Sequence, residues 1–397
     1  MPKITASEAL SRLRILDLSR VRAGPTCVKQ FADFGADVIK IESPPGVDPN
    51  ENMGGPRHGP DMQNLHRNKR AMTLNLKLAD AREVLARLVK TADVVVENYR
   101  PDVKYRLGVD YESLSRINPR IILASISGFG QDGPYQKRPG FDQIAQGMSG
   151  LMSVTGEPGR GPMRTGAAIA DVSAGLFAAL GIMTALLERD VSGKGQWVQS
   201  SLLQSGIALL DFQAARYLMK GEVPGQVGND HPTSMPTSAY TTADGYINIG
   251  ASGEGMWVRL CEAIGRKELL RAPEFAGAEN RAKNRGALNA ALNASLKERT
   301  TGEWIELLNQ AGVPCGPIYA VDQVFEDPQV QHLEAAADVD HPVLGHFRVV
   351  NQAVKLSRTP AKVVAPTPEV GQHTDEILAE LQYSEADIRG MRQRGIV

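Results

Sequence analysis

One carboxylate stands out in this 397-residue sequence because nearly all of its neighbours are small and apolar. Asp171 lies in RTGAAIADVSAGLF, at the expected beginning of a long helix. An aspartate at that place could cap the helix by accepting hydrogen bonds from the amides of its first turn. It could also attack an acyl carbonyl, because a helix N-terminus favours an ionised and therefore nucleophilic carboxylate. Composition alone favours the cap, and the two roles are compatible.

Basic residues form a second group with chemical potential, since guanidinium and ammonium groups make charge-assisted hydrogen bonds to phosphate oxygens. Any one of them could instead belong to a solvated surface. The cluster consists of Lys40, Arg67, Lys69, Arg70, Arg100, Lys104, Arg106, Lys137 and Arg138. Collectively these residues indicate a ligand that carries several phosphates.

Common nucleotide-binding and catalytic motifs are missing from the sequence. The segment LDLSRVRAGP has one glycine where a dinucleotide-binding loop needs three, which disfavours a nicotinamide-dependent dehydrogenase. Neither a GxxxxGK[ST] loop nor a GxSxG elbow occurs. The seven histidines include no HExxH pair, so we expect no metal centre.

Composition sets the protein class. The 44 Lys and Arg residues nearly balance the 45 Asp and Glu residues, so no nucleic-acid partner is expected. The three cysteines are widely separated, as is usual in a reducing compartment. We see no secretory signal and no run of 18 apolar residues, and therefore expect a cytoplasmic protein without a membrane partner.

The elements that must position these residues alternate along the chain. Five apolar runs of strand length are separated by helical patterns: RILDLS, VIKIE, MTLNL, DVVVENY and RIILASISGFG. Such alternation predicts an α/β fold with a Rossmann-like parallel sheet. Ligands of such sheets bind beyond the carboxyl ends of the strands. The site is therefore expected at residues 20–25, 42–45, 98–100 and 128–134.

The length predicts more than one domain, because single cores stop growing near 250–300 residues. We expect a large α/β lobe over residues 1–215, a smaller α+β domain over 216–325, and a C-terminal return to the large lobe over 326–397. The Gly- and Pro-rich segment KGEVPGQVGNDHPTSMPTS marks the first boundary. In the small domain we expect a hairpin that turns at Asp244 and Gly245, and a capping box between Thr300 and Glu303.

In their order, the motifs resemble the class III coenzyme A transferases of the CaiB/BaiF type, which include formyl-CoA transferase. The resemblance covers LDLSRVRAGP, FGADVIKIE, NKRAMTLNLK, ADVVVENYRP, PRIILASISGFGQDGP, GAAIADVSAGLFAALGIMTAL, KGQWV, GVPCGP and GQHTDEIL. It implies that Asp171 attacks an acyl-CoA and carries CoA as an aspartyl thioester to a second acid. It also implies that CoA and acyl-CoA are substrates, that no cofactor is permanently bound, and that ring-like chains interlock as a homodimer.

The resemblance also implies which residues contact CoA. The matching positions, with Lys137 added from the basic cluster, are Val21, Arg22, Lys40, Leu74, Leu76, Lys77, Asn98, Tyr99, Arg106, Lys137 and Leu202. Lys40 and Arg106 suit phosphates. Asn98 and the apolar members suit adenine and pantetheine.

Two departures from formyl-CoA transferase concern the acid. That enzyme has glutamine in place of Arg22 and a run of glycines in place of GQVGNDHPTS, so residues 225–238 need not form its lid. Arg22 could pair with a second carboxylate, which predicts succinyl-CoA or a similar donor and a dicarboxylic acceptor, or it could bind a CoA phosphate or a carbonyl. The residues expected to recognise the acid are Arg22, Phe141, Asn229, Asp230 and His231.

The main alternative is an acyl-CoA racemase or isomerase of the same fold. Racemases of this fold have a histidine in a G-H-D motif, where this sequence reads GFDQIAQ with Phe141. Without an imidazole opposite Asp171, two-base proton exchange lacks a partner. We therefore prefer transfer, although a dehydratase-like reaction stays open. A CoA-binding protein without activity is disfavoured because Asp171 is present.

Overall fold

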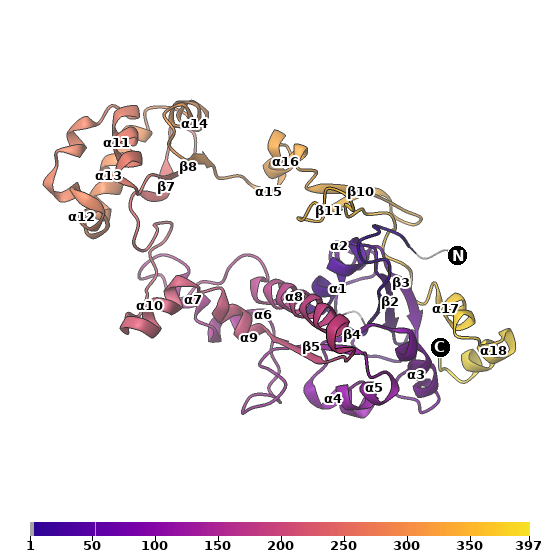
Figure 1. The fold of residues 1–397 in the computed structure, drawn as a ribbon. Helices are drawn as coiled ribbons and strands as arrows, with labels where there is room; N and C mark the ends of the chain where they lie inside the picture. Colours follow the sequence, from indigo (N-terminus) through magenta and orange to yellow (C-terminus); the bar gives the residue numbers. More distant parts are fainter. Residues whose placement is uncertain (1–3, 52) are drawn as a thin grey trace. The chain divides into compact units, whose positions relative to one another are not determined.

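The computed structural model describes residues 4–51 and 53–397 and contains helices and strands throughout (Figure 1). It divides into two compact units. The first unit comprises the chain up to Leu151, then 165–219 and 328–397, and the second comprises 152–164 and 220–327. The sequence prediction placed the boundaries at 216 and 326. It did not anticipate that 152–164 belongs to the second unit.

A six-stranded sheet forms the centre of the first unit, in the order β3-β2-β1-β4-β5-β6. Its strands are β1 (Arg14–Asp17), β2 (Asp37–Glu42), β3 (Arg70–Thr73), β4 (Val94–Glu97), β5 (Ile122–Ser127) and β6 (Trp197–Ser201). All neighbouring strands pair in parallel, which confirms the predicted α/β class. The strand order reverses between β1 and β4. In open α/β sheets such a reversal is where ligands bind.

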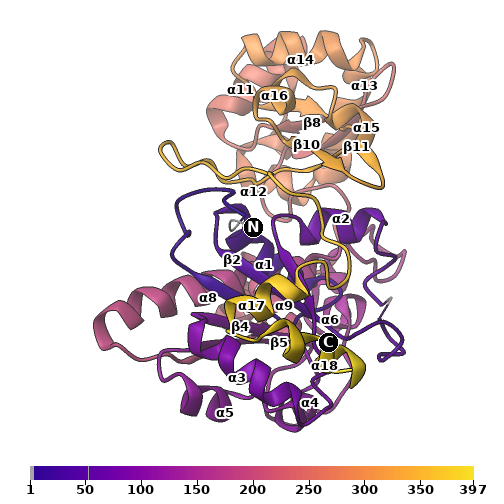
Figure 2. The ribbon, with the colours of Figure 1, turned by 90° about the vertical axis from the view of Figure 1, so that its right-hand side faces the viewer.

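Helices cover both faces of this sheet, which explains why its strands are almost continuously apolar. One core joins the sheet to α3 (Ala81–Thr91), α5 (Tyr111–Ile117) and two C-terminal helices, α17 (Thr374–Glu380) and α18 (Glu385–Gln393). Figures 1 and 2 show these two yellow helices lying near α3. The second core joins the sheet to α1 (Ala23–Asp33) and α8 (Ile169–Ser192).

Close packing of α8 against α1 depends on a glycine in α8. A Cβ atom at Gly175 would lie 2.5 Å from the carbonyl oxygen of Ala23. The second turn of α8 can therefore approach the beginning of α1 only because this position has no side chain.

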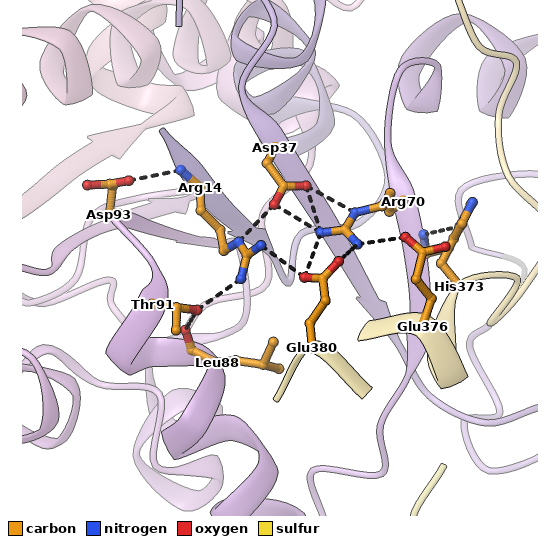
Figure 3. A network of polar contacts seen from close by, with 10 residues as sticks. Arg14, Asp37, Arg70, Leu88, Thr91, Asp93, His373, Glu376 and Glu380 are labelled. Carbon is orange, nitrogen blue, oxygen red and sulfur yellow. Dashed lines mark hydrogen bonds and ion pairs between the residues drawn. The ribbon is translucent and has the colours of Figure 1, made fainter. Parts of the chain in front are cut away.

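The C-terminal return is joined to the sheet by a partly buried network of charges (Figure 3). Arg70 donates to both carboxylate oxygens of Asp37, at 3.0 and 2.9 Å, and to Glu376 and Glu380 of α17, at 3.0 and 2.6 Å. Arg14 of β1 also donates to Asp37 and Glu380. Segments more than 300 residues apart in sequence are thereby connected at one point.

The rest of the first unit consists of short elements. They are α2 (Pro60–His66), α4 (Pro101–Leu107), α6 (Asp142–Met148), α9 (Leu202–Ala208), α10 (Phe212–Lys220), α16 (Pro328–His332), β10 (Ala336–His341) and β11 (Gly345–Val350). The last two strands form an antiparallel hairpin.

The second unit is a smaller α+β structure with its own core around Trp257, Leu292 and Trp304. Its elements are α7 (Leu151–Val154), β7 (Thr237–Thr241), β8 (Tyr246–Gly250), α11 (Glu254–Ala263), η1 (Lys267–Leu270), η2 (Pro273–Phe275), α12 (Gly277–Lys283), α13 (Arg285–Leu296), α14 (Thr301–Gln310), β9 (Cys315–Pro317) and α15 (Val321–Val324). The antiparallel β7–β8 hairpin around Asp244 and the capping box between Thr300 and Glu303 are confirmed.

One helix bears on the expectation that the protein has no membrane partner. Within the described residues, α8 is long and apolar enough to cross a membrane, judged by length and composition alone. Half of its most apolar stretch is buried in the structure, and the helix packs on α1, β5 and β6. A helix of the protein core has the same length and composition, so these two features are not by themselves evidence for a membrane-spanning segment.

Candidate active site

A cavity of about 790 Å³ opens beyond the carboxyl ends of the parallel strands. All four loops that were expected to form the site contribute residues to it: 20–23, 42–43, 98–100 and 128–130. Further lining residues come from the segment after β3 and from the first turn of α8. The cavity thus lies where the strand order predicts a ligand.

Most of the residues expected to contact CoA line this cavity. They are Val21, Arg22, Leu74, Leu76, Lys77, Asn98, Tyr99, Arg106 and Leu202. Lys40 and Lys137 are not among the lining residues. Lys40 is 4% exposed, and its Nζ donates to the carbonyl oxygen of Ser19 at 3.1 Å. Its ammonium therefore stabilises the loop after β1. This position gives no evidence for the predicted contact with a CoA phosphate.

Asn98 also has a local task. Its Oδ1 accepts from the amide of Arg20 at 2.8 Å, and its Nδ2 donates to the carbonyl oxygen of Arg20 at 2.7 Å. Both ends of the side-chain amide are thereby engaged with the loop that follows β1. The main role of Asn98 at the cavity is therefore to hold this loop in shape. A hydrogen bond from Asn98 to adenine would require its Oδ1 or Nδ2 to give up a bond to Arg20.

The loop after β1 has an unusual backbone conformation at Val21. Its φ of 61° lies in the left-handed region, which a β-branched residue rarely adopts. Such a conformation costs on the order of 1–3 kcal/mol and is concentrated at functional sites. Val21 directly precedes Arg22, so the strained residue sets the direction in which the chain enters α1.

Asp171 lines the cavity from the first turn of α8. The N-cap of α8 is Ala168, so the expectation that Asp171 itself caps the helix is wrong. Asp142 performs that task from 28 residues upstream, because its Oδ1 accepts from the amides of Ala170 and Asp171 at 2.8 and 3.1 Å. Among the described residues, the Asp171 carboxylate itself forms no hydrogen bond and no ion pair.

Gln146 completes the support of this turn. Its Nε2 donates to Oδ2 of Asp142 at 2.6 Å, and its Oε1 accepts from the amide of Thr165 at 2.9 Å. Asp142 and Gln146 are buried, in the segment GFDQIAQ. Only Phe141 of this segment was predicted to matter from the sequence, and the capping pair was missed. An acid and an amide four residues apart on one short helix were the available signal.

The environment of Asp171 raises its pKa to about 6. Burial is the largest cause, the negative charge of Asp142 adds to it, and the positive charge of Arg22 opposes both. The carboxyl group is therefore largely ionised at neutral pH, yet it is poorly solvated. Both conditions favour nucleophilic attack.

Several members of the predicted basic cluster have a structural task. Arg67 makes a bidentate pair with Asp33 of α1 at 3.0 and 2.8 Å, and Lys69 pairs with Asp17 of β1 at 2.8 Å. Arg70 belongs to the network of the C-terminal return, and Lys104 is fully buried beside Gln131. These four side chains are buried and line no part of the cavity, which corrects their interpretation as phosphate ligands.

Three members of the predicted basic cluster do line the cavity, namely Arg100, Arg106 and Arg138. The other cationic lining residues are Arg20, Arg22 and Lys77. The carboxylates that line the same cavity are Glu42, Asp48 and Asp171. Positive charge therefore predominates, as a polyanionic ligand requires.

Comparison with known proteins identifies the family. A model of the CoA-transferase family III matches residues 10–374. The chain belongs to this family. It is therefore a class III CoA-transferase, and enzymes of this class act on CoA thioesters.

Individual relatives cover nearly the whole chain. The succinate–glutarate CoA-transferase of Agrobacterium fabrum is 36% identical over 385 residues, 95% of this chain and 96% of that protein. The succinyl-CoA–D-citramalate CoA-transferase of Chloroflexus aurantiacus is 35% identical over 393 residues, 98% of both chains. The crystal structure of a CaiB/BaiF family protein from Brucella suis has a TM-score of 0.81 and 36% identity, over 93% of this chain and 98% of that one.

The position that separates transfer from racemisation also lies at the cavity of this class III CoA-transferase. Phe141 lines the cavity with Asp171, and 58% of it is exposed. Among the described residues, no histidine lines this cavity. A second proton-transferring imidazole opposite Asp171 is thus missing from the site that this unit forms.

The three remaining candidates for acid recognition lie in the second unit of the CoA-transferase. Asn229 borders a shallow hollow between β7, β8 and β9. Asp230 accepts from the Ser238 hydroxyl at 2.6 Å and from Asn289. Nδ1 of His231 accepts from the amides of Thr233 and Ser234. Their role in acid recognition stays a prediction.

One group of residues in the described chain has the composition of a metal site, namely His58, His341 and Glu369. Nδ1 of His341 accepts from the amides of Val343 and Leu344 at 3.1 and 3.3 Å. In the neutral ring the proton therefore sits on Nε2, the atom nearest Glu369, and that atom has no lone pair for a metal. Glu369 instead pairs with Nε2 of His58 at 2.7 Å, and the Nε2 of His341 lies 4.0 Å from it.

Proposed function

We propose that this class III enzyme transfers CoA between dicarboxylic acids through a covalent aspartyl-CoA thioester on Asp171. One observation carries the proposal. Asp171 presents a carboxylate without a partner among the described residues to a large cationic cavity, while Asp142 holds the backbone from which it projects.

The proposed chemistry needs no redox step. The Asp171 carboxylate attacks the carbonyl carbon of the donor thioester, and the C–S bond breaks to give a mixed anhydride and free CoA thiolate. The thiolate then attacks the Asp171 carbonyl carbon, which releases the donor acid as a carboxylate and forms the aspartyl-CoA thioester. The acceptor carboxylate reverses both steps. Covalent catalysis thus divides one difficult exchange into smaller barriers.

The cavity supplies distinct environments for the two substrates. Exposed cations such as Arg100, Arg106 and Arg138 suit the phosphates of CoA, whereas Leu74, Leu76 and Leu202 suit its apolar arm. Arg22 acts electrostatically on Asp171 and suits the distal carboxylate of a dicarboxylic acid. The names of the two relatives refer to succinate, glutarate, succinyl-CoA and citramalate, which supports acids of this class.

A homodimer is part of the proposal. Leu180, Leu187 and Val191 of α8 are 63, 66 and 90% exposed, and Leu218 and Met219 of α10 are about as exposed. Exposed apolar faces of this kind mark association surfaces. Sedimentation analysis should show a dimer, and a stable monomer at micromolar concentration would refute this part of the proposal.

An acid panel tests the function. The protein is incubated with succinyl-CoA and one of several acids, and new thioesters are detected by mass spectrometry. We expect CoA esters of C4 to C6 dicarboxylic acids. Exchange of the α-proton with solvent deuterium, without formation of any new thioester, would instead support a racemase.

A further inference from the structure

Arg22 is already paired with a carboxylate of the same chain. Its Nη2 donates to Oδ1 of Asp61 at 2.6 Å. Asp61 lies in the first turn of α2, directly after Pro60. The guanidinium whose charge acts on Asp171 is therefore occupied by an acid from the protein.

This ion pair is easily opened. The side chains of Arg22 and Asp61 are 31 and 57% exposed, and exposed ion pairs contribute little free energy. Asp61 stays well accommodated when released, because the N-terminus of a helix favours a carboxylate. Arg22 lines the cavity, whereas Asp61 lies outside it and binds the same guanidinium. A carboxylate of a ligand in the cavity would therefore compete with Asp61 for Arg22.

The same segment occupies a second arginine of the site. Asp48 pairs with Arg20, and both side chains line the cavity. Residues 48–61 thus supply carboxylates to both arginines of the loop after β1. Carboxylates of the protein occupy places that are suited to anionic groups of a substrate.

We propose that Asp61 is a substitute ligand of Arg22, and that a dicarboxylic acid displaces it with the carboxylate that does not react. This inference rests on the proposed function, since it concerns the acid that reacts at Asp171. The single carboxylate of a monocarboxylic acid reacts at Asp171, so no second carboxylate is available and the Arg22–Asp61 ion pair stays intact. A dicarboxylic acid exchanges one carboxylate for another at Arg22, so the pair selects for dicarboxylic acids.

Two acids of equal length test the proposal, glutarate and pentanoate, with saturating succinyl-CoA as donor. In a double-displacement reaction, kcat/KM for the acceptor reports only the half-reaction in which the acceptor takes CoA from the enzyme. Asp61→Asn removes the competing charge and should raise kcat/KM for glutarate about two- to fivefold. Arg22→Gln should lower it about 10- to 100-fold, because a charge-assisted hydrogen bond is lost. Asp61→Asn should leave kcat/KM for pentanoate nearly unchanged. Arg22→Gln removes a charge that acts on Asp171 and should lower kcat/KM for pentanoate by a smaller factor than kcat/KM for glutarate, so the glutarate-to-pentanoate ratio is the quantity compared.

The double variant separates competition from an indirect effect. If Asp61 acts through Arg22, then Asp61→Asn has no effect on the glutarate-to-pentanoate ratio in the Arg22→Gln background. Asp102→Asn is a matched control, because Asp102 also follows a proline at the start of a seven-residue helix and pairs with an exposed arginine, Arg106. Asp102→Asn should leave the ratio unchanged.

Specific outcomes overturn the proposal. An unchanged ratio in Asp61→Asn, or an equal increase with and without Arg22, would show that Asp61 does not compete for the substrate carboxylate. The aspartyl-CoA adduct is measured in the same samples. If the adduct forms while the ratio is unchanged, only the role of Asp61 fails; without an adduct or any transfer, the proposed function fails as well.

Discussion

Basic side chains occupy two regions of the first unit, and the regions differ in what neutralises their charge. Between β1, β2, β3 and α1, Arg67, Lys69 and Arg70 pair with buried aspartates. At the cavity, six cations face three carboxylates, and three of these cations, Arg100, Arg106 and Arg138, are exposed. A buried cation needs a partner within the fold, whereas an exposed cation can take a ligand. Whether a basic side chain stabilises the fold or is available to a ligand therefore depends on its pairing within the protein more than on whether it is Lys or Arg.

The largest expected effect tests the buried region. Arg70→Met removes a guanidinium that is 2% exposed and leaves Asp37, Glu376 and Glu380 without their shared partner. Unfolding in urea should show a loss of about 2–4 kcal/mol, because several charge-assisted hydrogen bonds of this buried guanidinium are lost while Arg14 still pairs with Asp37 and Glu380. Arg106→Met, in an exposed pair, should cost less than about 0.5 kcal/mol. Equal losses of unfolding free energy in Arg70→Met and Arg106→Met would contradict the distinction between the two regions.

The next effect concerns the turn that carries Asp171. Asp142→Ala removes the acceptor of two amides at the start of α8. Small displacements of a reacting group lower rates by up to about 100-fold, so kcat should fall about 10- to 100-fold while KM for the CoA donor changes little. A variant with normal kcat would show that this turn does not need Asp142.

Asp171 itself should lower stability at neutral pH. Its pKa is raised in the folded protein to about 6, above the ordinary 3.8, so the folded state favours the protonated form. The resulting penalty is absent below pH 4, grows between pH 4 and 6, and is complete above pH 6. Asp171→Asn should therefore be more stable than the wild type at pH 7.5, by on the order of 1–2 kcal/mol after allowance for partial exposure. The two proteins should converge toward pH 4 in urea unfolding, and a less stable variant at pH 7.5 would contradict this account.

The smallest effects are shifts of the pH profile. Transfer should rise with pH through about 6 as Asp171 ionises. Asp142→Asn removes a charge that raises this pKa and should move the rise to lower pH, whereas Arg22→Gln removes a charge that lowers it and should move the rise to higher pH. Each shift should be below about one pH unit. Shifts in the same direction would show that these charges do not act on Asp171.

Local signals predicted much of this molecule. The runs at β1, β2, β4 and β5, the helix of Asp171 and the Thr300–Glu303 capping box follow from periodicity and capping chemistry. The cavity position follows from strand alternation.

What the sequence did not predict depends on pairings between distant segments. Asp142 caps a helix 28 residues away, and the aspartates that neutralise Arg67 and Lys69 precede them by 34 and 52 residues. The strand β6 was missed because WVQSS lacks a regular apolar pattern, and α6, α7 and α8 separate it in the chain from β5, with which it pairs. Periodicity within a short window contains no information on such partners.

The most direct test of the account asks whether Asp171 carries CoA. The protein is incubated with succinyl-CoA without an acceptor, quenched in acid, digested and analysed by tandem mass spectrometry. We predict a hydroxylamine-sensitive CoA thioester on Asp171, and its absence from Asp171→Asn. A thioester on another residue, or normal transfer by Asp171→Ala, would contradict the central claim.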